Sequence, residues 1–318
     1  TVPIGTNQSI LALLQEKAAK AVTFEIASNP EFLSQGTAVK DTLHASRIVI
    51  GTQTPHARKV LTDIYEAFGQ PIVNTDIKSA EMIKYASNDF LALKISYMNE
   101  IANLCEITGA DVQDVARGMG YDPRIGNKFL AAGIGYGGSC FPKDTKALHW
   151  LANFNDYELK TIKAAIEVNE NQKLKLLKKS RKYCSSLQGK RIAVLGLTFK
   201  PGTDDLRDAP SLQNIPYLLE SGAEVFAWDP VGIPNFKKLY PNELQYCETI
   251  EEALHGAELC FIFTEWPQVK ALDPAVFVRQ MASPVILDGR NCFDLKAMEA
   301  LPVVYDSIGR RAIRNLAK

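Results

Sequence analysis

The segment 133–144, GIGYGGSCFPKD, combines a thiol, two charged side chains and several glycines. The glycines are Gly133, Gly135, Gly137 and Gly138. Because glycine has no side chain, a ligand can approach such a backbone closely. Cys140 follows the glycines, so its thiol could reach a substrate as a nucleophile. Lys143 and Asp144 would place a cation and a carboxylate nearby, which makes this loop the strongest sign of chemistry in the chain.

Each of these residues also has an ordinary structural interpretation. Cys140 could be a buried apolar residue, as most lone cysteines are. Asp144 could cap the helix DTKALHWLA, and Lys143 could be a solvated surface residue. We favour chemistry because all three stand beside the glycines. A cysteine hydrolase would in addition need a base brought close by folding, and the four histidines are His44, His56, His149 and His255.

Two further polar sites stand apart from the loop. Lys84 and Asn88 are four residues apart in a segment with helical periodicity, so they share one helix face. Their structural alternative is a polar stripe. Residues 28–31, SNPE, fit a capping box, in which Glu31 would only close the start of a helix.

The sequence has no GxGxxG fingerprint between a strand and a helix. The turn 196–208, GLTFKPGTDDLRD, carries Lys200 and Arg207 and could hold a phosphate by a different arrangement. Asp229 ends an expected strand, where dinucleotide folds place a ribose-binding acid. A turn-forming Asp before Pro230 fits that position equally well.

Alternating helices and strands predict an α/β architecture at both ends of the chain. In the first part, strands are expected at 21–28, 46–52 and 71–75, with helices at 9–20 and 55–69. In the last part, strands are expected at 191–196, 223–229, 259–264 and 284–289, with a helix near 210–221. The later strands are continuous apolar runs, which predicts a doubly wound, mostly parallel sheet covered on both faces.

The middle of the chain is expected to be all-helical. Residues 75–108 contain no Gly or Pro, and Thr75 could cap a helix of about 50 Å. Apolar residues surround much of this helix, which suggests burial on more than one side and a homodimer formed through it. Further helices are expected from Asp111, after Asp144 and over 157–184.

Composition narrows the classes of function. Thirty-six basic residues balance thirty-six acidic ones, so no global charge favours nucleic acid or an anionic membrane. No apolar run approaches the roughly 20 residues of a membrane span, and no basic start followed by an apolar core marks a signal peptide, so the expected location is the cytoplasm. Six scattered cysteines without a CxxC pair argue against disulfides and against a metal site. The start without Met, on residues typical of the second half of an α/β domain, suggests that a segment is missing upstream.

Four blocks of the sequence together resemble the UDP-glucose 6-dehydrogenases, within the nucleotide-sugar dehydrogenases. The blocks are SNPEFLSQGTAVKD at 28–41, KYASNDF at 84–90, RIGNKFLAAGIGYGGSCFPKD at 124–144 and FKPGTDDLRDAPS at 199–211. They stand in the family's order and spacing, and the likeness runs from the first residue to roughly the last strand. Because four ordered blocks are more specific than one, we prefer the chemical interpretations above.

The resemblance implies three domains. These are the remainder of an N-terminal NAD-binding Rossmann-like domain at 1–74, a helical dimerisation domain with the cysteine loop at 75–187, and a Rossmann-like UDP-sugar-binding domain at 188–318. Thr1 matches the threonine of the family's STVP segment, which places the glycine fingerprint and the ribose-binding acid upstream of it. The expectation is a truncated chain that lacks most of the cofactor site.

The resemblance also implies the reaction. The family are NAD-dependent oxidoreductases that convert the C6 alcohol of UDP-glucose into the carboxylate of UDP-glucuronate, a polysaccharide precursor, in two hydride transfers. GDP-mannose and UDP-N-acetylmannosamine dehydrogenases are close alternatives, although Tyr136 and the FPKD motif favour UDP-glucose. The chain could instead be a UDP-sugar-binding fragment without turnover, or a cysteine acyl-hydrolase.

Residue roles follow from motif position. Cys140 would be the nucleophile whose thiohemiacetal and thioester allow the second oxidation. Lys84 and Asn88 would face the C6 oxygen, Asp144 would order a water and move protons, and Glu31 would assist hydrolysis of the thioester.

The resemblance implies further contacts with the ligands. Thr1 would hold the water that Asp144 orders and would also contact the cofactor. The other implied cofactor residues are Gln35, Lys143 and Arg207. The other implied substrate residues, besides Glu31, Lys84 and Asn88, are Phe32, Leu33, Arg124, Phe129, Ile134, Gly135, Tyr136, Gly137, Phe199, Lys200 and Arg290, with Arg124 acting across the dimer interface. Gln35 replaces an acid of the family's NPEFLxEG block, and an amide cannot accept a proton as a carboxylate does.

Overall fold

The computed structural model describes residues 1–18 and 22–316. The chain forms two compact units, one of Thr1–Phe90 with Asp144–Leu159 and one of Leu91–Lys143 with Lys160–Lys318. Each unit is described by itself below. The three-domain division at 74/75 and 187/188 stays a prediction.

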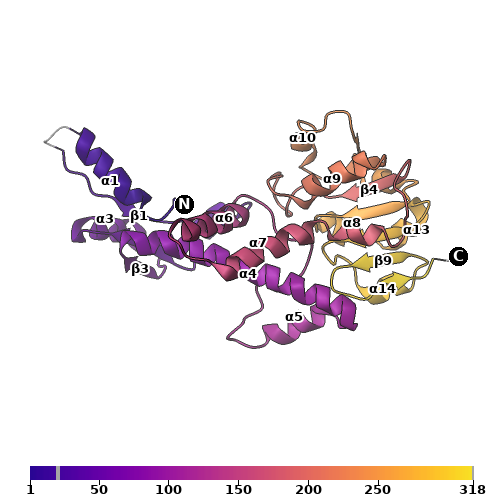
Figure 1. The fold of residues 1–318 in the computed structure, drawn as a ribbon, viewed down its shortest axis with the longest axis horizontal. Helices are drawn as coiled ribbons and strands as arrows, with labels where there is room; N and C mark the ends of the chain where they lie inside the picture. Colours follow the sequence, from indigo (N-terminus) through magenta and orange to yellow (C-terminus); the bar gives the residue numbers. More distant parts are fainter. Residues whose placement is uncertain (19–21, 317–318) are drawn as a thin grey trace. The chain divides into compact units, whose positions relative to one another are not determined.

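A small sheet forms the centre of the first unit (Figure 1). Its strands are β1 (Ala27–Ser28), β2 (Ile48–Thr52) and β3 (Ile72–Thr75), in the order β1-β2-β3. The helices of this part are α1 (Thr6–Lys17), α2 (Ala38–Leu43) and α3 (Pro55–Glu66). All five residues of β2 are buried, which confirms the apolar strand expected at 46–52. The strand expected at 71–75 and the helix expected at 55–69 are also confirmed.

The strand expected at 21–28 is much shorter in the structure. Residue 21 lies outside the described residues, and among 22–28 only Ala27 and Ser28 join the sheet, antiparallel to β2. Glu25 explains part of the difference, because its carboxylate contacts the side chains of Thr54 and His56 at the start of α3. The first sheet is therefore mixed, since β2 and β3 are parallel.

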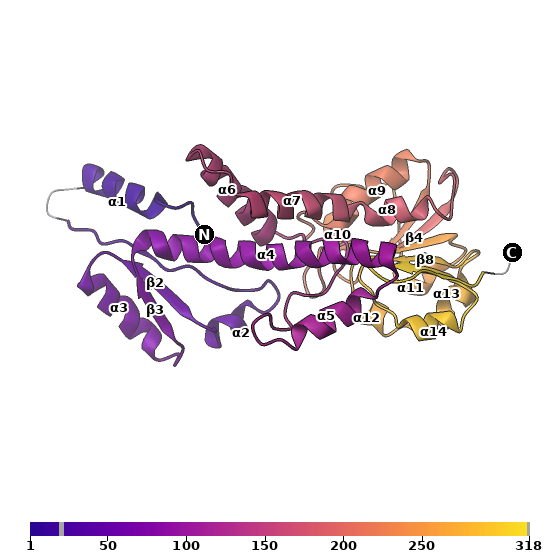
Figure 2. The same cartoon turned by 60° about the horizontal axis from the view of Figure 1, so that its bottom comes forward.

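Helix α4 (Ile77–Thr108) confirms the long helix expected from the sequence, and Figure 2 shows its length. Its cap is Asp76 and not Thr75, because Asp76 Oδ1 accepts a hydrogen bond from the Ser79 amide at 2.9 Å. Gly51 of β2 lets the helix start close to the sheet, since a Cβ there would lie 2.4 Å from that of Ala80. Close packing thus fixes where α4 leaves the sheet.

The remaining helices of the middle segment are α5 (Val112–Gly120), α6 (Cys140–Phe154), α7 (Lys160–Lys173) and α8 (Lys175–Ser180). Asp111 caps α5 as expected, by accepting from the Gln113 amide at 2.8 Å. Two expectations were wrong. Helix α6 begins at Cys140, so Asp144 lies inside it and is not its cap, and the helical stretch expected at 157–184 is two helices that meet at Leu174.

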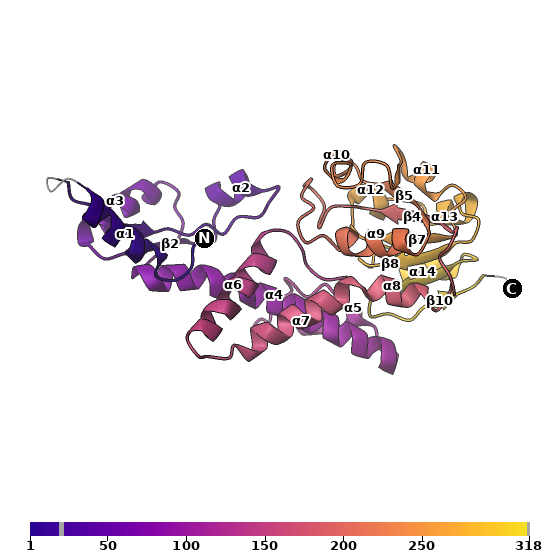
Figure 3. The same cartoon turned by 45° about the horizontal axis from the view of Figure 1, so that its top comes forward.

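A seven-stranded sheet forms the core of the second unit (Figure 3). Its order is β10-β9-β8-β7-β4-β5-β6, and every pairing is parallel except that of β9 with β10. The strands are β4 (Arg191–Leu195), β5 (Glu224–Trp228), β6 (Gln245–Tyr246), β7 (Leu259–Ile262), β8 (Val285–Asp288), β9 (Val304–Ser307) and β10 (Ile313–Arg314). The helices are α9 (Pro210–Glu220), α10 (Ile233–Phe236), α11 (Ile250–Leu254), α12 (Pro267–Lys270), α13 (Ala275–Gln280) and α14 (Leu295–Glu299).

The four strands expected in this part are confirmed, as is the doubly wound architecture. β4, β7 and β8 are buried almost throughout, which agrees with their apolar sequences. No helix in the described part of the chain is long and apolar enough to cross a membrane. All six cysteines are free thiols.

Asp229 organises the loops at the end of β5. One carboxylate oxygen accepts from the amides of Leu197 at 2.7 Å and Thr198 at 3.2 Å, and from the Trp266 indole at 3.0 Å. The other oxygen accepts from the Gly232 amide at 2.6 Å. Only 3% of the surface of Asp229 is exposed, and both of its carboxylate oxygens already accept hydrogen bonds from the protein. This favours the turn-forming interpretation over a ribose-binding acid.

Replacing Asp229 by Asn should lower the free energy of unfolding by about 2 to 4 kcal/mol. The amide keeps one acceptor but turns an NH₂ group toward buried N–H donors, which then lose their partner. Urea unfolding followed by circular dichroism measures the change. Asp114→Asn is the control, because Asp114 is 65% exposed. Equal stability of the two variants would contradict the assigned role.

Candidate functional site

A polar cluster in the first unit joins three of the expected catalytic residues. Lys84 on α4 is only 2% exposed, and its Nζ lies 3.2 Å from Glu31 Oε1. Thr1 and Lys84 line the same small cavity of about 180 Å³. The ammonium group of Lys84 is therefore sheltered from solvent and held by a carboxylate, as a cation that stabilises a developing negative charge requires.

Asn88, a fourth expected catalytic residue, lies one turn after Lys84 and binds a fifth, Asp144. Its Nδ2 donates to Asp144 Oδ2 at 2.6 Å, and both side chains are buried. This bond ties α4 to α6. The polar stripe that the sequence allowed for Lys84 and Asn88 is thus a pair of specific buried contacts.

Glu31 does not belong to a capping box, because residues 29–34 form no helix. Its Oε2 accepts from the Leu33 amide at 2.6 Å in an exposed turn. Partial burial raises the pKa of Glu31, but the Leu33 bond and the charge of Lys84 outweigh it, so the pKa lies below its ordinary value. Beside it, the Phe32 ring lies under the Arg47 guanidinium at 3.8 Å. Glu31 is therefore an ionised carboxylate at neutral pH.

Asp89 was not singled out in the sequence, yet it lies beside this cluster. It is 2% exposed, and neither carboxylate oxygen has a hydrogen-bond partner among the described residues. Burial, with a further contribution from the charge of Asp144, raises the pKa of Asp89 to about 7. Burial also raises the pKa of Tyr85, and the charges of Asp144, Asp89 and Glu81 raise it further. Only folding reveals this acid, because its position on α4 looks like any other polar position.

In the second unit, side chains of α4, α7 and the sheet hold the glycine loop. Asn99 Oδ1 accepts from the Gly133 amide at 2.9 Å, and Gln172 Nε2 donates to the Gly133 carbonyl at 2.8 Å. Asn169 bonds both the amide and the carbonyl of Tyr136, at 2.8 and 3.1 Å. Residues 132–138 are consequently buried. The loop is a fixed part of the fold.

The glycines make room for the protein's own atoms. A Cβ on Gly137 would lie 2.5 Å from the Asp208 carbonyl oxygen, and one on Gly138 would lie 2.7 Å from the Phe199 ring. Gly138 also has a φ of 79°, which disfavours any other residue. The sequence led us to expect that the glycines clear space for ligands, whereas at these two positions they admit Phe199 and the chain before α9.

Cys140 is the first residue of α6, and of the six cysteines only its side chain is classed as exposed. The alternative of a buried packing cysteine, which the sequence left open, therefore does not apply to Cys140. Arg207 is held by Asp205 through a two-pronged contact, with Nε 2.9 Å from Oδ1 and Nη2 2.8 Å from Oδ2. The pKa of Arg207 is raised first by these bonds, and the charge of a Cys140 thiolate adds to the effect. The thiol thus lies in the field of an oriented cation.

Arg290 connects the glycine loop with the sheet. It follows β8, and its guanidinium donates to the carbonyls of Gly135 at 3.1 Å, Phe199 at 3.3 Å and Phe263 at 2.9 Å. Lys200 lies over the Phe199 ring at 5.6 Å. These expected substrate residues gather at the carboxyl ends of β4, β7 and β8, where ligands of doubly wound folds bind.

The remaining expected site residues occupy varied positions. Tyr136 and Phe129 both pack edge-on against Phe141, with ring centres 5.7 and 6.2 Å apart. Ile134 is fully buried, and Leu33 lines a cavity with Glu31 and Phe32. Phe129, Gln35, Lys143 and Arg124 are exposed, and Arg124 is paired with Asp122 at 2.6 Å.

A cavity of about 490 Å³ in the second unit escaped the sequence interpretation. Its wall includes Gln113, Tyr121 and Asn127 from α5 and the segment after it, together with Arg290 and Asn291 after β8. Only folding brings these segments together, which is why no sequence signal marked the cavity.

Three family models match successive parts of the chain. All describe the UDP-glucose/GDP-mannose dehydrogenase family. Its NAD binding domain matches residues 1–69, its central domain residues 78–171 and its UDP binding domain residues 193–295.

Individual proteins match over almost the whole chain. UDP-glucose 6-dehydrogenase YwqF of Bacillus subtilis (strain 168) is 48% identical over 313 residues, which are 98% of this chain and 71% of that protein. UDP-glucose 6-dehydrogenase of Rhizobium meliloti (strain 1021) is 42% identical, over 98% of this chain and 72% of that protein. The structure of a UDP-glucose dehydrogenase from the hyperthermophilic archaeon Pyrobaculum islandicum has a TM-score of 0.90 and 37% identity, over 98% of this chain and 69% of the other.

The match of residues 1–69 contradicts the expectation that the NAD-binding domain is truncated. That expectation was based on the start without Met, on the match of Thr1 to the family's STVP segment and on the missing glycine fingerprint. The fingerprint marks one turn of such a domain and not the domain as a whole, and residues 1–69 supply α1 to α3 and two strands of its sheet.

The raised pKa of Asp89 should make the stability of the protein depend on pH. Unfolded Asp89 releases its proton near the ordinary pKa of 3.8, whereas folded Asp89 keeps it up to about 7. The folded state therefore binds more protons in this window, and the free energy of unfolding should fall as pH rises through it, by at most about 4 kcal/mol. Asp89→Asn should remove this fall, as measured by urea unfolding between about pH 4 and about pH 8.

The matched control is Asp63→Asn, because Asp63 is an exposed acid on α3. This variant should keep the pH dependence of the wild type. An unchanged dependence in Asp89→Asn would show that Asp89 is ionised in the folded protein.

Proposed function

The chain belongs to the UDP-glucose/GDP-mannose dehydrogenase family, an NAD-dependent oxidoreductase family, and on this premise we propose that it oxidises UDP-glucose to UDP-glucuronate. The relatives named UDP-glucose 6-dehydrogenase support the choice of substrate. The observation that carries the mechanism is the exposed thiol of Cys140 at the start of α6. A one-step alcohol oxidation would need no such nucleophile.

Cys140 solves the problem of the second oxidation. The first oxidation removes a hydride from C6 and a proton from its hydroxyl, which leaves an aldehyde. The thiolate adds to the aldehyde carbon, and the oxygen takes up a proton, so that a thiohemiacetal forms with a hydroxyl on C6. Loss of a second hydride and proton gives a thioester. Water then cleaves the carbon–sulfur bond, which releases the carboxylate and regenerates the thiol.

The buried polar cluster supplies the charges for these steps. The Lys84 ammonium stabilises the negative charge on the C6 oxygen while hydride leaves. Asn88 fixes Asp144 through the 2.6 Å bond, so that Asp144 can order a water molecule and move protons. Glu31, ionised beside Lys84, assists the attack of water on the thioester. Thr1 holds the water molecule that Asp144 orders.

NAD is the cofactor of the family, and its nicotinamide accepts the hydride when it is bound. The fit can be judged at Arg207, whose side chain is 63% exposed although Asp205 fixes its orientation. A pre-oriented guanidinium of this kind suits a diphosphate. Lys143 and Gln35, both exposed, would also contact the cofactor.

The UDP binding domain of the family supports a UDP-sugar as substrate. In this proposal, Lys200, Arg290 and Arg124 bind the sugar nucleotide, and the loop 131–137 lies along it. Phe32, Leu33 and Phe199 provide apolar contacts. The domain limits 1–74, 75–187 and 188–318 and the cytoplasmic location are part of the same proposal.

Cys140→Ser should reduce the formation of UDP-glucuronate at least about 1000-fold, because a hydroxyl is a far weaker nucleophile than a thiolate at neutral pH. NADH absorbance together with chromatography of the sugar nucleotide measures the loss. Cys184→Ser, at a partly exposed cysteine, is the control and should keep normal turnover. Normal glucuronate production by Cys140→Ser would refute the thioester route. Turnover of GDP-mannose or UDP-N-acetylmannosamine in place of UDP-glucose would refute the substrate.

We also propose a homodimer formed through α4. Phe90, Tyr97 and Leu104 are 61%, 49% and 54% exposed and stand seven residues apart, so they share one helix face. An exposed apolar stripe of this length favours burial against a second copy.

Tyr97→Glu with Leu104→Glu should convert the dimer into a monomer, because two buried charges would then face each other across the interface. Size-exclusion chromatography with light scattering reports the mass. Tyr217→Glu is the control, since Tyr217 on α9 is 52% exposed and lies away from α4 in sequence. A wild-type protein that is already monomeric would contradict the proposed interface.

A further inference from the structure

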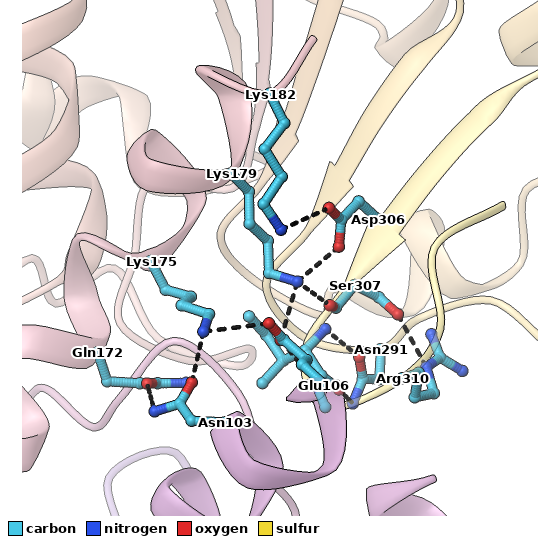
Figure 4. A network of polar contacts seen from close by, with 12 residues as sticks. Asn103, Glu106, Gln172, Lys175, Lys179, Lys182, Asn291, Asp306, Ser307 and Arg310 are labelled. Carbon is cyan, nitrogen blue, oxygen red and sulfur yellow. Dashed lines mark hydrogen bonds and ion pairs between the residues drawn. The ribbon is translucent and has the colours of Figure 1, made fainter. Parts of the chain in front are cut away.

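Helix α8 presents a line of lysines toward the end of α4 and the strand β9 (Figure 4). Residues 173–182, KLKLLKKSRK, contain six basic residues and no acidic one, although the whole chain has no net charge. Lys175 and Lys179 stand four residues apart on α8 and so share a helix face, and Lys182 follows in the turn after the helix. This local charge is unused by the proposed reaction.

Two carboxylates neutralise the inner part of this line. Lys179, 2% exposed, lies between Glu106 Oε1 at 2.8 Å and Asp306 Oδ1 at 2.5 Å. Glu106 also binds Lys175 at 3.1 Å, and Asp306 accepts from the Tyr183 hydroxyl at 2.7 Å. Glu106 and Asp306 are therefore already paired with groups of the protein.

Further cations around them are poorly neutralised. Arg310 is 2% exposed, and its four hydrogen bonds go to the neutral oxygens of Ser307, Gln113, Phe293 and Tyr305. Lys182 is half exposed, and its Nζ lies 3.9 Å from Asp306 Oδ2, which is an ion pair too long for a hydrogen bond. Arg314 is exposed and lies 5.5 Å from the centre of the Tyr183 ring.

These cations surround a cavity of about 400 Å³ in the second unit. Its lining residues are Glu106, Lys179, Lys182, Asp306, Arg310, Arg311, Ala312 and Arg314. Five of these are basic and two are acidic. Arg311 is paired with Glu299, which does not line the cavity, and the other four basic residues still outnumber the two acids. A neighbouring cavity of about 220 Å³ shares Lys182 and Arg314 and adds Tyr183, Val304 and Leu316.

We propose that this cavity binds a small anion with linked phosphate groups, at a site separate from the one that takes the sugar nucleotide. Lysine and arginine are the side chains that bind phosphates, and guanidinium forks add direction. A buried arginine with neutral partners already lowers the cost of bringing negative charge into the cavity. None of the lining residues belongs to the proposed catalytic, cofactor or substrate set.

Calorimetry with inorganic tripolyphosphate in low salt and without NAD tests the site, once with the protein alone and once in the presence of excess UDP-glucose. We expect one equivalent to bind to the wild type, and the double variant Lys182→Glu with Arg314→Glu to lose at least about tenfold in affinity. The matched control is Lys237→Glu with Lys238→Glu, which changes the net charge equally at two exposed lysines near Tyr246. It should bind like the wild type.

Three outcomes would overturn the proposal: no binding to the wild type, equal loss in the two double variants, or binding that UDP-glucose abolishes. Unchanged thermal unfolding and unchanged oxidation of UDP-glucose by Lys182→Glu with Arg314→Glu would show that the variant is folded. Because binding is measured without turnover, its result does not depend on the proposed reaction.

Discussion

Polar side chains buried along α4 must find partners, and this requirement organises both units of the molecule. A buried donor or acceptor left alone costs roughly 1 to 3 kcal/mol, so each such residue specifies a tertiary contact. The contacts are those of Glu81 with Asn7, Lys84 with Glu31, Asn88 with Asp144, Ser96 with Ala165, Asn99 with Gly133 and Glu106 with Lys179. The helix therefore holds the proposed catalytic groups in the first unit and the glycine loop in the second. Asp89 breaks the rule, because its carboxylate has no partner among the described residues, and burial raises its pKa to about 7.

The glycine loop shows how a reactive side chain can be exposed on a rigid support. Asn99, Asn169 and Gln172 fix its backbone, and Phe199 fills the space that the glycines leave. Cys140 follows at the start of α6, outside this packing. Rigid support reduces the entropy lost when the thiol meets a substrate carbon. The loop thus serves the proposed chemistry through packing as much as through open space.

Charge is distributed locally although it cancels over the whole chain. The basic residues of α8 meet the arginines that follow β9, and Glu106 and Asp306 are the two acids among the described residues that line the cavity with them. The same principle operates at Arg207, which Asp205 orients, and at Arg290, which carbonyl oxygens hold. Composition excluded a global polyanion partner but could not reveal these local sites, since it carries no information on which segments meet.

The sequence by itself determined the α/β ends, the long middle helix and the candidate residues Cys140, Lys84 and Asp144, because these depend on local periodicity and on ordered motifs. Its cap for the long helix was wrong by one residue, since Asp76 and not Thr75 accepts from the first turn. The capping alternatives for Glu31 and Asp144 do not apply, since both side chains bind partners from distant segments. The short antiparallel β1, the break between α7 and α8 and the raised pKa of Asp89 were decided only by tertiary structure. Burial and pairing depend on residues far apart in the chain, and no local pattern encodes them.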